Sequence, residues 1–166
     1  MISSFFIKFL KKQPLLVHGT SPRYYAIGGG KKEPLFTFDG GSDELFVKQK
    51  ILFLQSLQIE SEVLFRTHQV HSNTVYVLKD QKIFSKEFFR FEADAIVTNL
   101  TDCPIAVLTA DCVPIVIYDP VKYVIGVVHA GRLGTEKSIF TNTIEAFYRE
   151  YGSNPEDLVV GMGPAI

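Results

Sequence analysis

Two apolar runs, at residues 114–119 and 123–130, constrain the fold more than any other feature of the chain. They read PIVIYD and YVIGVVHA, and Asp119-Pro120 marks a turn between them. Nearly every position in both runs is apolar, which is typical of strands that are covered on both faces. The two runs therefore predict central strands of a sheet with other layers packed against it.

The remaining segments supply both helices and strands. Residues 43–58 predict a helix capped by Ser42, and the helix predicted from Thr135, its cap, to Tyr151 ends at Gly152. The apolar residues of this second helix are expected to face inward: Ile139, Phe140, Ile144 and Phe147. Further strands are predicted at 62–67, 74–79, 93–98, 103–110 and 158–163. Together these elements predict an α/β (layered α+β) fold, in which helices flank mixed β-sheets.

Length and composition are those of one globular domain over residues 1–166. The chain is 46% hydrophobic and 21% charged, which is not the composition of a disordered segment. Its 17 basic and 18 acidic residues leave a formal charge of −1, so charge gives no support for a nucleic-acid or anionic-membrane partner. The stretch 20–42 is rich in Gly and Pro and predicts turns or a mobile loop. The oligomeric state is left open.

The first residues, MISSFFIKFLKKQPLLV, do not predict a secretory signal. Their apolar run is short, and Lys11 and Lys12 follow it, whereas the positive charges of a signal peptide come first. A membrane span needs about 20 apolar residues. We expect a cytoplasmic protein whose first residues form an opening strand or an amphipathic segment.

Three residues at predicted strand ends form a candidate metal site: His71, Cys112 and His129. Two imidazoles and one thiolate match a catalytic zinc site, in which a fourth position stays open for water or substrate. His68 is expected to point away from His71, because side chains alternate along an extended segment. A buried thiol and a hydrogen-bonded structural histidine remain open as alternatives. The chain has only two cysteines, so a disulfide framework is not expected.

The loop after His129 is a candidate anion site. Gly131 and Gly134 would let the backbone approach a ligand closely, and a helix beginning near Thr135 would offer free N–H groups. Arg132 would add positive charge, and phosphate would suit this position. The loop GRLGTEKS does not satisfy the P-loop pattern. A solvated turn with a single arginine explains the same residues equally well.

Five motifs resemble one known family in the same order: HQVHSNTV, ADAIVT, LTADCVPIVIYD, VVHAG and GMGPAI. The resemblance runs from His68 to Ile166. The family is that of the purine nucleoside phosphorylases with a laccase domain, also described as multicopper polyphenol oxidases and, for some bacterial members, as peptidoglycan editing factors. It implies a Zn²⁺ ion bound by His71, Cys112 and His129. It also implies phosphorolysis of adenosine, inosine and methylthioadenosine, with adenosine deamination as a further activity.

The chain departs from the family pattern at three places. Members usually read H-A-G-W-R-G where this chain reads HAGRLG, which moves the arginine to Arg132. Where members often carry Asn-Arg on the first helix, this chain has Gln49-Lys50, and lysine keeps the charge without the bidentate fork. Members also continue beyond Gly-Pro, so a C-terminal segment is expected to be missing after Ile166.

The residue patterns and the resemblance together lead to two sets of predicted site residues. The catalytic set is His71, Cys112, His129 and Arg132. The substrate- or phosphate-binding set is Lys50, Gly131, Arg132, Gly134 and Thr135. Supporting roles are expected for the polar residues inside the matched motifs: Asp94, Thr109 and Asp111.

Three other functions compete with a zinc-dependent nucleoside phosphorylase. A true multicopper laccase needs many more imidazoles than the four present, although incidental Cu²⁺ binding fits a His₂Cys set. A peptidoglycan-precursor editing amidase would use zinc, or Cys112 as a nucleophile with His71 or His129 as its base. A truncated, inactive or scaffolding copy is the non-enzymatic alternative.

Overall fold

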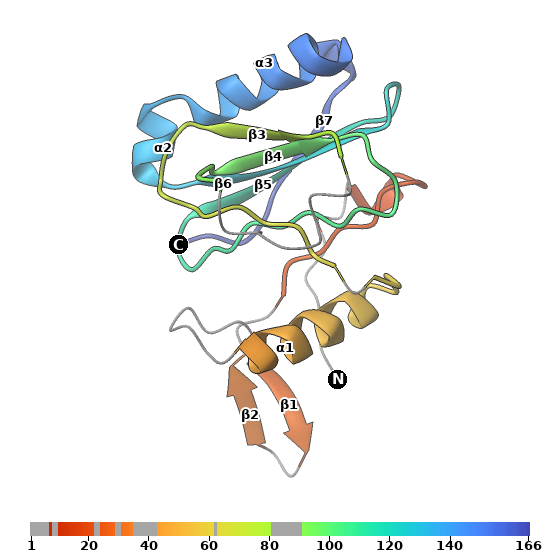
Figure 1. Cartoon of the computed structure of the whole chain (residues 1–166), viewed down its shortest axis with the longest axis vertical. Coiled ribbons are helices and arrows are strands. Elements are labelled where there is room, and N and C mark those ends of the chain that lie inside the picture. Colours follow the sequence, from red (N-terminus) through yellow and green to blue (C-terminus); the bar gives the residue numbers. More distant parts are fainter. Residues whose placement is uncertain are drawn as a thin grey trace. The chain divides into compact units, whose positions relative to one another are not determined.

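The computed structural model describes residues 7, 10–21, 24–28, 31–34, 43–61, 63–80 and 91–166. The chain divides into two compact units, Met1–Glu62 and Val63–Ile166. Figure 1 colours them from red to yellow and from yellow to blue, respectively. Among the described residues, no helix is both long enough and apolar enough to cross a membrane.

The first unit contains a short 3-10 helix, a two-stranded sheet and one long helix. Helix η1 is Leu10–Lys12, strands β1 (Tyr24–Gly28) and β2 (Lys31–Pro34) pair antiparallel, and helix α1 is Asp43–Ser56. The helix predicted at 43–58 is confirmed. The prediction of turns or a loop over 20–42 is wrong for 24–28 and 31–34, because the aromatic and β-branched residues of YYAI favour a strand despite the flanking glycines. The predicted cap Ser42 and residues 1–6, 8 and 9 of the predicted opening segment lie outside the described residues.

The second unit is built on a five-stranded mixed sheet. Its strands are β3 (Val75–Leu78), β4 (Ala95–Thr98), β5 (Val113–Asp119), β6 (Val124–Ala130) and β7 (Val159–Met162). The spatial order is β3-β4-β6-β5-β7. Strands β3 and β4 run parallel, and the other neighbours pair antiparallel. These strands confirm the predicted mixed sheet and the strands predicted at 74–79, 93–98, 114–119, 123–130 and 158–163.

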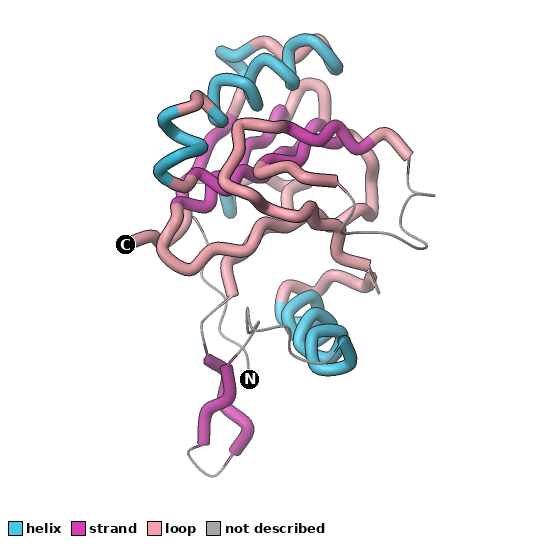
Figure 2. The backbone as a smooth tube through the Cα atoms, turned by 60° about the vertical axis from the view of Figure 1, so that its left-hand side comes forward, coloured by secondary structure: helices cyan, strands magenta, loops and turns pink. Residues whose placement is uncertain are grey.

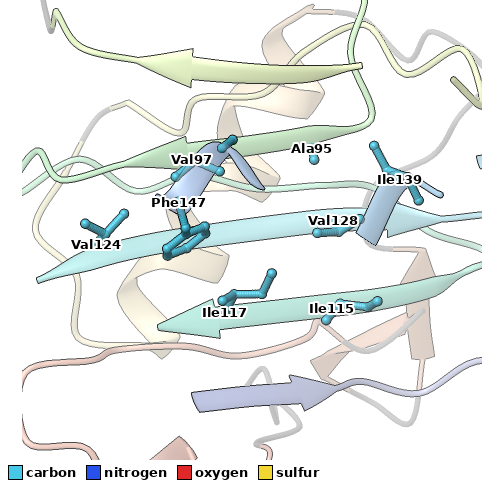
Figure 3. Packing of buried hydrophobic residues seen from close by; sticks show 9 residues of the cluster. Ala95, Val97, Ile115, Ile117, Val124, Val128, Ile139 and Phe147 are labelled. Atoms are coloured by element: carbon cyan, nitrogen blue, oxygen red, sulfur yellow. The ribbon is translucent and has the colours of Figure 1, made fainter. Parts of the chain in front are cut away.

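The sheet is covered on both faces, as its apolar strands predicted. Along β4, Ala95 and Val97 pack with Ile139 and Phe147 of helix α3 (Ile139–Tyr151), whereas Ile96 packs with Phe65 and other residues on the opposite face. Figure 2 shows helix α3 on one side of these strands and loop segments of the same unit on the other. Figure 3 shows Phe147 and Ile139 against the side chains of the strands. Each of the buried Val, Ile and Phe side chains contributes about 1.5–3 kcal/mol of hydrophobic stabilisation.

Two predicted strands are wrong. The described part of 62–67 and the segment 103–110 are loops, joined only by a bridge in which Phe65 pairs with Ile105. The ladder stops after this bridge because the side chain of Gln69 occupies the backbone groups of Leu108. Nε2 of Gln69 donates to the Leu108 carbonyl, and Oε1 accepts the Leu108 N–H, at 2.7 Å each. These two loops cover the second face of the sheet, and their buried apolar residues account for the strand-like pattern.

The helix predicted over 135–151 is two helices. Helix α2 is Arg132–Glu136, helix α3 begins at Ile139, and Ser138 between them is left-handed with φ 65°. The side chain of Asn73 donates to the carbonyl of Lys137 at 2.9 Å and so occupies an acceptor that a continuous helix needs. The predicted end at Gly152 is confirmed. Phe140 is 37% exposed, so its predicted inward position is wrong.

Candidate metal centre

His71 lies on a turn that is built around one buried carboxylate. Oδ2 of Asp94 accepts hydrogen bonds from the backbone N–H groups of Val70 (3.3 Å) and Ser72 (2.6 Å) and from the Ser72 hydroxyl (2.8 Å). Oδ1 of Asp94 accepts the N–H of His71 at 3.0 Å. His71 itself is left-handed, with φ 57°. The turn therefore holds the exposed imidazole of His71 on a backbone that few non-glycine residues adopt.

His129 comes from strand β6 and is held by the same carboxylate. Its Nδ1 lies 2.8 Å from Oδ1 of Asp94, and its side chain is buried. Burial raises the pKa of Asp94, but hydrogen bonds from His129, Ser72 and Val70 outweigh this effect, so the pKa lies below its ordinary value. An ionised carboxylate only accepts hydrogen bonds, so Nδ1 carries a proton, and in the neutral imidazole Nε2 of His129 is then the nitrogen with a lone pair.

Cys112 completes the group at the residue before strand β5. Its Sγ lies 4.0 Å from Nε2 of His71, and the rings of His71 and His129 meet edge to face with centroids 4.8 Å apart. The candidate ligand atoms of the three residues all lie within 4.8 Å of one another. The structure therefore brings together the three residues that the sequence placed at strand ends. His68 is not in this group; its backbone forms a bridge with Glu92 instead.

The surroundings of this trio fit a metal ion. Two imidazoles and one thiol are a common donor set for Zn²⁺, and tetrahedral bonding would place such donors about 3.3–3.6 Å apart. The backbone of Gly131 lies beside them, and a Cβ there would be 2.9 Å from Cδ2 of His71 and 3.0 Å from Sγ of Cys112. Glycine at residue 131 thus leaves the donors room to close around an ion.

The loop after His129 differs from the predicted anion site. Helix α2 begins at Arg132 with Gly131 as its N-cap, so the prediction that Thr135 caps a helix is wrong. The N–H of Thr135 donates to the Gly131 carbonyl at 2.9 Å and is not free to bind phosphate. A Cβ on Gly134 would lie 2.9 Å from the Ser72 carbonyl, so Gly134 allows close packing of α2 on the His71 turn.

The two predicted cationic residues lie in different units. Arg132 is on the exposed side of α2, where Nη1 donates to Glu136 Oε1 at 2.9 Å. An exposed pair of this kind is weak, so Arg132 is available to an anion. Lys50 belongs to helix α1 of the first unit. The predicted roles of Arg132 and Lys50 in binding substrate stay predictions.

Two residues outside the predicted site sets support the centre. Asp94 has the supporting role expected for it, although the sequence did not reveal that it contacts both histidine segments. Gln69 holds the loop that leads to Cys112 through its two bonds to Leu108. The sequence contained one signal for Gln69, namely a polar side chain two residues before a candidate ligand.

The comparisons with known proteins agree with the resemblance read from the motifs. The model of the family described as multi-copper polyphenol oxidoreductase laccase matches residues 37–166. The purine nucleoside phosphorylase YlmD of Bacillus subtilis is 30% identical over 148 residues, which is 84% of this chain and 53% of that protein. A purine nucleoside phosphorylase of Homo sapiens is 39% identical over 105 residues, which is 63% of this chain and 23% of that protein.

Solved structures show the same fold. The Bacillus licheniformis hypothetical protein YfiH aligns with a TM-score of 0.72 at 25% identity, over 89% of this chain and 58% of that one. YlmD from Geobacillus stearothermophilus aligns with a TM-score of 0.69 at 23% identity, over 80% of this chain and 50% of that one. The chain thus spans about half the length of these two structures and of the Bacillus subtilis relative. Because the family model matches well over half of the residues of this chain, the chain belongs to the family described as multi-copper polyphenol oxidoreductase laccase.

Proposed function

We propose that this chain carries the metal site of a zinc-dependent purine nucleoside phosphorylase acting on adenosine, inosine and methylthioadenosine. The observation that carries the proposal is the convergence of His71, Cys112 and His129 within 4.8 Å. Relatives named purine nucleoside phosphorylase support the reaction class. A cytoplasmic location stays a prediction from the first residues of the chain.

The proposed reaction joins phosphate to the sugar as the base leaves. A phosphate oxygen forms a bond to C1′ of the ribose while the C1′–N9 bond breaks, and the purine keeps the bonding electrons and gains a proton. When bound, Zn²⁺ supplies a Lewis acid for a phosphate or water oxygen. The chain's residues would hold the ion: Asp94 fixes the ring of His129, and glycine at residue 131 keeps the space beside the trio clear of a side chain.

Charge for the phosphate is proposed to come from Arg132, whereas Lys50 of the first unit stays a prediction as a substrate-binding residue. Arg132 would exchange its exposed partner Glu136 for the anion at little cost, since both side chains are largely in water. Thr135 remains in the proposed phosphate set through its exposed side chain alone, because its N–H is used within α2. Adenosine deamination is proposed as a second outcome at the same metal, with water in place of phosphate.

Copper chemistry of the laccase type is disfavoured by the imidazole count of this chain. The sequence has four histidines, and two of them belong to the proposed trio. His18 is engaged with the backbone of Ile7, and His68 lies outside the cluster. A trinuclear copper cluster needs more imidazoles than these, so any Cu²⁺ bound here is proposed to occupy the zinc site incidentally.

A thiol hydrolase is the second candidate, and one distance favours it. Sγ of Cys112 lies 4.0 Å from Nε2 of His71, a spacing that fits a thiol and its base before substrate tightens the contact. In this alternative, Cys112 attacks an amide carbonyl of a peptidoglycan precursor, and His71 takes the thiol proton and gives it to the amine that leaves as the C–N bond breaks. Water then hydrolyses the thioester and frees Cys112. Activity would then survive a strong chelator and disappear on alkylation of Cys112.

Product identification with adenosine tests the proposed function. The purified protein, saturated with zinc, is incubated with adenosine with and without phosphate, and products are separated by chromatography. We expect adenine and ribose 1-phosphate only when phosphate is present, and no products from Cys112→Ala. The matched control is Cys103→Ala, which removes the buried cysteine outside the trio and should keep the activity. Inosine alone would assign the site to deamination, and zinc binding without any product would contradict the proposal.

A further inference from the structure

Asp94 stands between the two histidine segments and contacts both of them. Its Oδ1 lies 2.8 Å from Nδ1 of His129 and 3.0 Å from the backbone N of His71. We propose that Asp94 is the positioning residue that couples the two histidine ligands, so that one carboxylate sets the metal affinity of the whole site. The inference rests on the metal site of the proposed function and deepens it.

On the His129 side, Asp94 fixes which ring nitrogen faces the metal. The carboxylate holds the proton on Nδ1 and leaves Nε2 as the donor atom. The backbone adds a second connection, because the carbonyl of Asp94 accepts the N–H of His129 at 2.7 Å. Ring orientation and tautomer at residue 129 therefore both depend on residue 94.

On the His71 side, Asp94 stabilises a turn that would not persist alone. The left-handed conformation of His71 costs free energy in a residue that carries a Cβ. Four hydrogen bonds from Val70, His71 and Ser72 converge on the Asp94 carboxylate and offset that cost. The Ser72 hydroxyl also accepts the N–H of Thr74 at 3.1 Å, which closes the turn.

Asparagine cannot satisfy both sides at once. If its amide oxygen faces His129, its NH₂ group meets the N–H groups of Val70 and Ser72, which are donors as well. If its oxygen faces the turn, its NH₂ group donates to Nδ1 of His129, and the ring proton then sits on Nε2 and blocks that donor atom. Either orientation of Asp94→Asn therefore weakens one histidine ligand.

Asp119 provides a matched control for the loss of a buried carboxylate. Both aspartates have no exposed surface, and Oδ1 of Asp119 likewise accepts two backbone N–H groups, from Val121 and Lys122. Asp119 pairs with Val124 at one end of the β5–β6 ladder, whereas His129 pairs with Pro114 near the other end. Asp119→Asn thus perturbs the fold without touching the trio.

The test measures zinc affinity by competition with a chromogenic chelator, without substrate, together with urea unfolding of the metal-free proteins. We expect Asp94→Asn to bind zinc about 10- to 100-fold more weakly than the parent. Asp119→Asn should bind zinc as the parent does, even if its urea unfolding midpoint falls as far as that of Asp94→Asn. With Co²⁺, Asp94→Asn should keep the thiolate charge-transfer band from Cys112 and change the ligand-field bands.

Ser72→Ala covers the case in which Asp94→Asn fails to fold. It removes one hydrogen bond from Oδ2 and leaves the carboxylate paired, and a smaller loss of zinc affinity is expected. The inference is overturned if Asp94→Asn binds zinc as tightly as the parent. If only Ser72→Ala folds, unchanged zinc affinity in that variant overturns it. Either result leaves the proposed function intact. If Asp94→Asn loses zinc affinity but the zinc-loaded parent makes no ribose 1-phosphate, the inference is upheld and the proposed function is contradicted.

Discussion

The backbone of Gly131 faces the sulfur of Cys112 so closely that a Cβ on residue 131 would lie 3.0 Å from Sγ. The same Cβ would lie 2.9 Å from Cδ2 of His71. Gly131 has φ −79° and ψ 170°, which any residue adopts, so the backbone does not require glycine there. Glycine at this position therefore serves the packing of the candidate ligands.

Gly131→Ala is expected to weaken zinc binding with little effect on the fold. The added methyl group pushes His71 and Cys112 apart, and we expect a loss of about tenfold or more in zinc affinity, close to 1.4 kcal/mol. Chelator competition measures the affinity, and urea unfolding of the metal-free protein measures the stability.

Gly152→Ala is the matched control for that variant. Gly152 is left-handed with φ +65° and has open space around its Cβ position, so alanine there should cost about 1–2 kcal/mol of unfolding free energy through backbone strain. Its zinc affinity should stay at the parental value. Parental zinc affinity in Gly131→Ala would show that the ligands do not need the space beside residue 131.

The two cysteines are expected to react very differently with a thiol reagent. Cys103 is buried and Cys112 is half-buried at the candidate site. Burial raises the pKa of Cys103 to about 11, so almost none of it is thiolate at neutral pH. In the native metal-free protein, one thiol should react quickly and the second only after denaturation. Zinc should protect the fast-reacting thiol, and the Cys112→Ala variant should have no fast-reacting thiol. Fast labelling of both thiols in the native protein would contradict this assignment.

Alkaline pH is expected to destabilise the fold through Cys103. Its pKa is about 11 in the native protein against an ordinary 9.0, so the native state keeps a proton that the unfolded chain loses between these values. The free energy of unfolding should therefore be unaffected below pH 9 and fall by up to about 2–3 kcal/mol as pH rises to 11.

Cys103→Ala isolates this alkaline effect in urea unfolding at several pH values. Burial also raises the pKa of Tyr76, Tyr118 and Tyr151, and these groups give the variant and the parent the same remaining slope. The variant should lose less stability than the parent between pH 9 and 11. Identical slopes would mean that Cys103 ionises as easily in the native state as in the unfolded chain.

The sequence predicted the sheet well because burial on both faces leaves a strong pattern. Runs such as 114–119 and 123–130 are apolar at nearly every position, and the structure has β5 and β6 there. The same pattern misled at 103–110, where apolar residues cover the sheet as a loop. Periodicity alone cannot separate a buried strand from a buried loop, because both bury apolar side chains; the bonds from Gln69 to Leu108 make the difference.

The candidate ligands were predictable, whereas the interactions that hold them were only partly so. His71, Cys112 and His129 stand next to turns at the ends of apolar segments, and a mixed sheet places such ends together. The roles of Asp94 and Asn73 depend on long-range contacts across 35 and 64 positions of sequence, respectively. No local pattern encodes such contacts. The break of the predicted helix at Ser138 was missed for the same reason.

The zinc content of purified protein tests the central claim most directly. Metal analysis of the parent and of the single variants His71→Ala, Cys112→Ala and His129→Ala, after equilibration with zinc and gel filtration, counts ions per chain. Each variant removes one of three protein ligands, and a structural zinc site can contribute on the order of 10 kcal/mol. We predict one zinc ion per chain in the parent and strongly reduced content in each variant. A full zinc complement in Cys112→Ala would contradict the account.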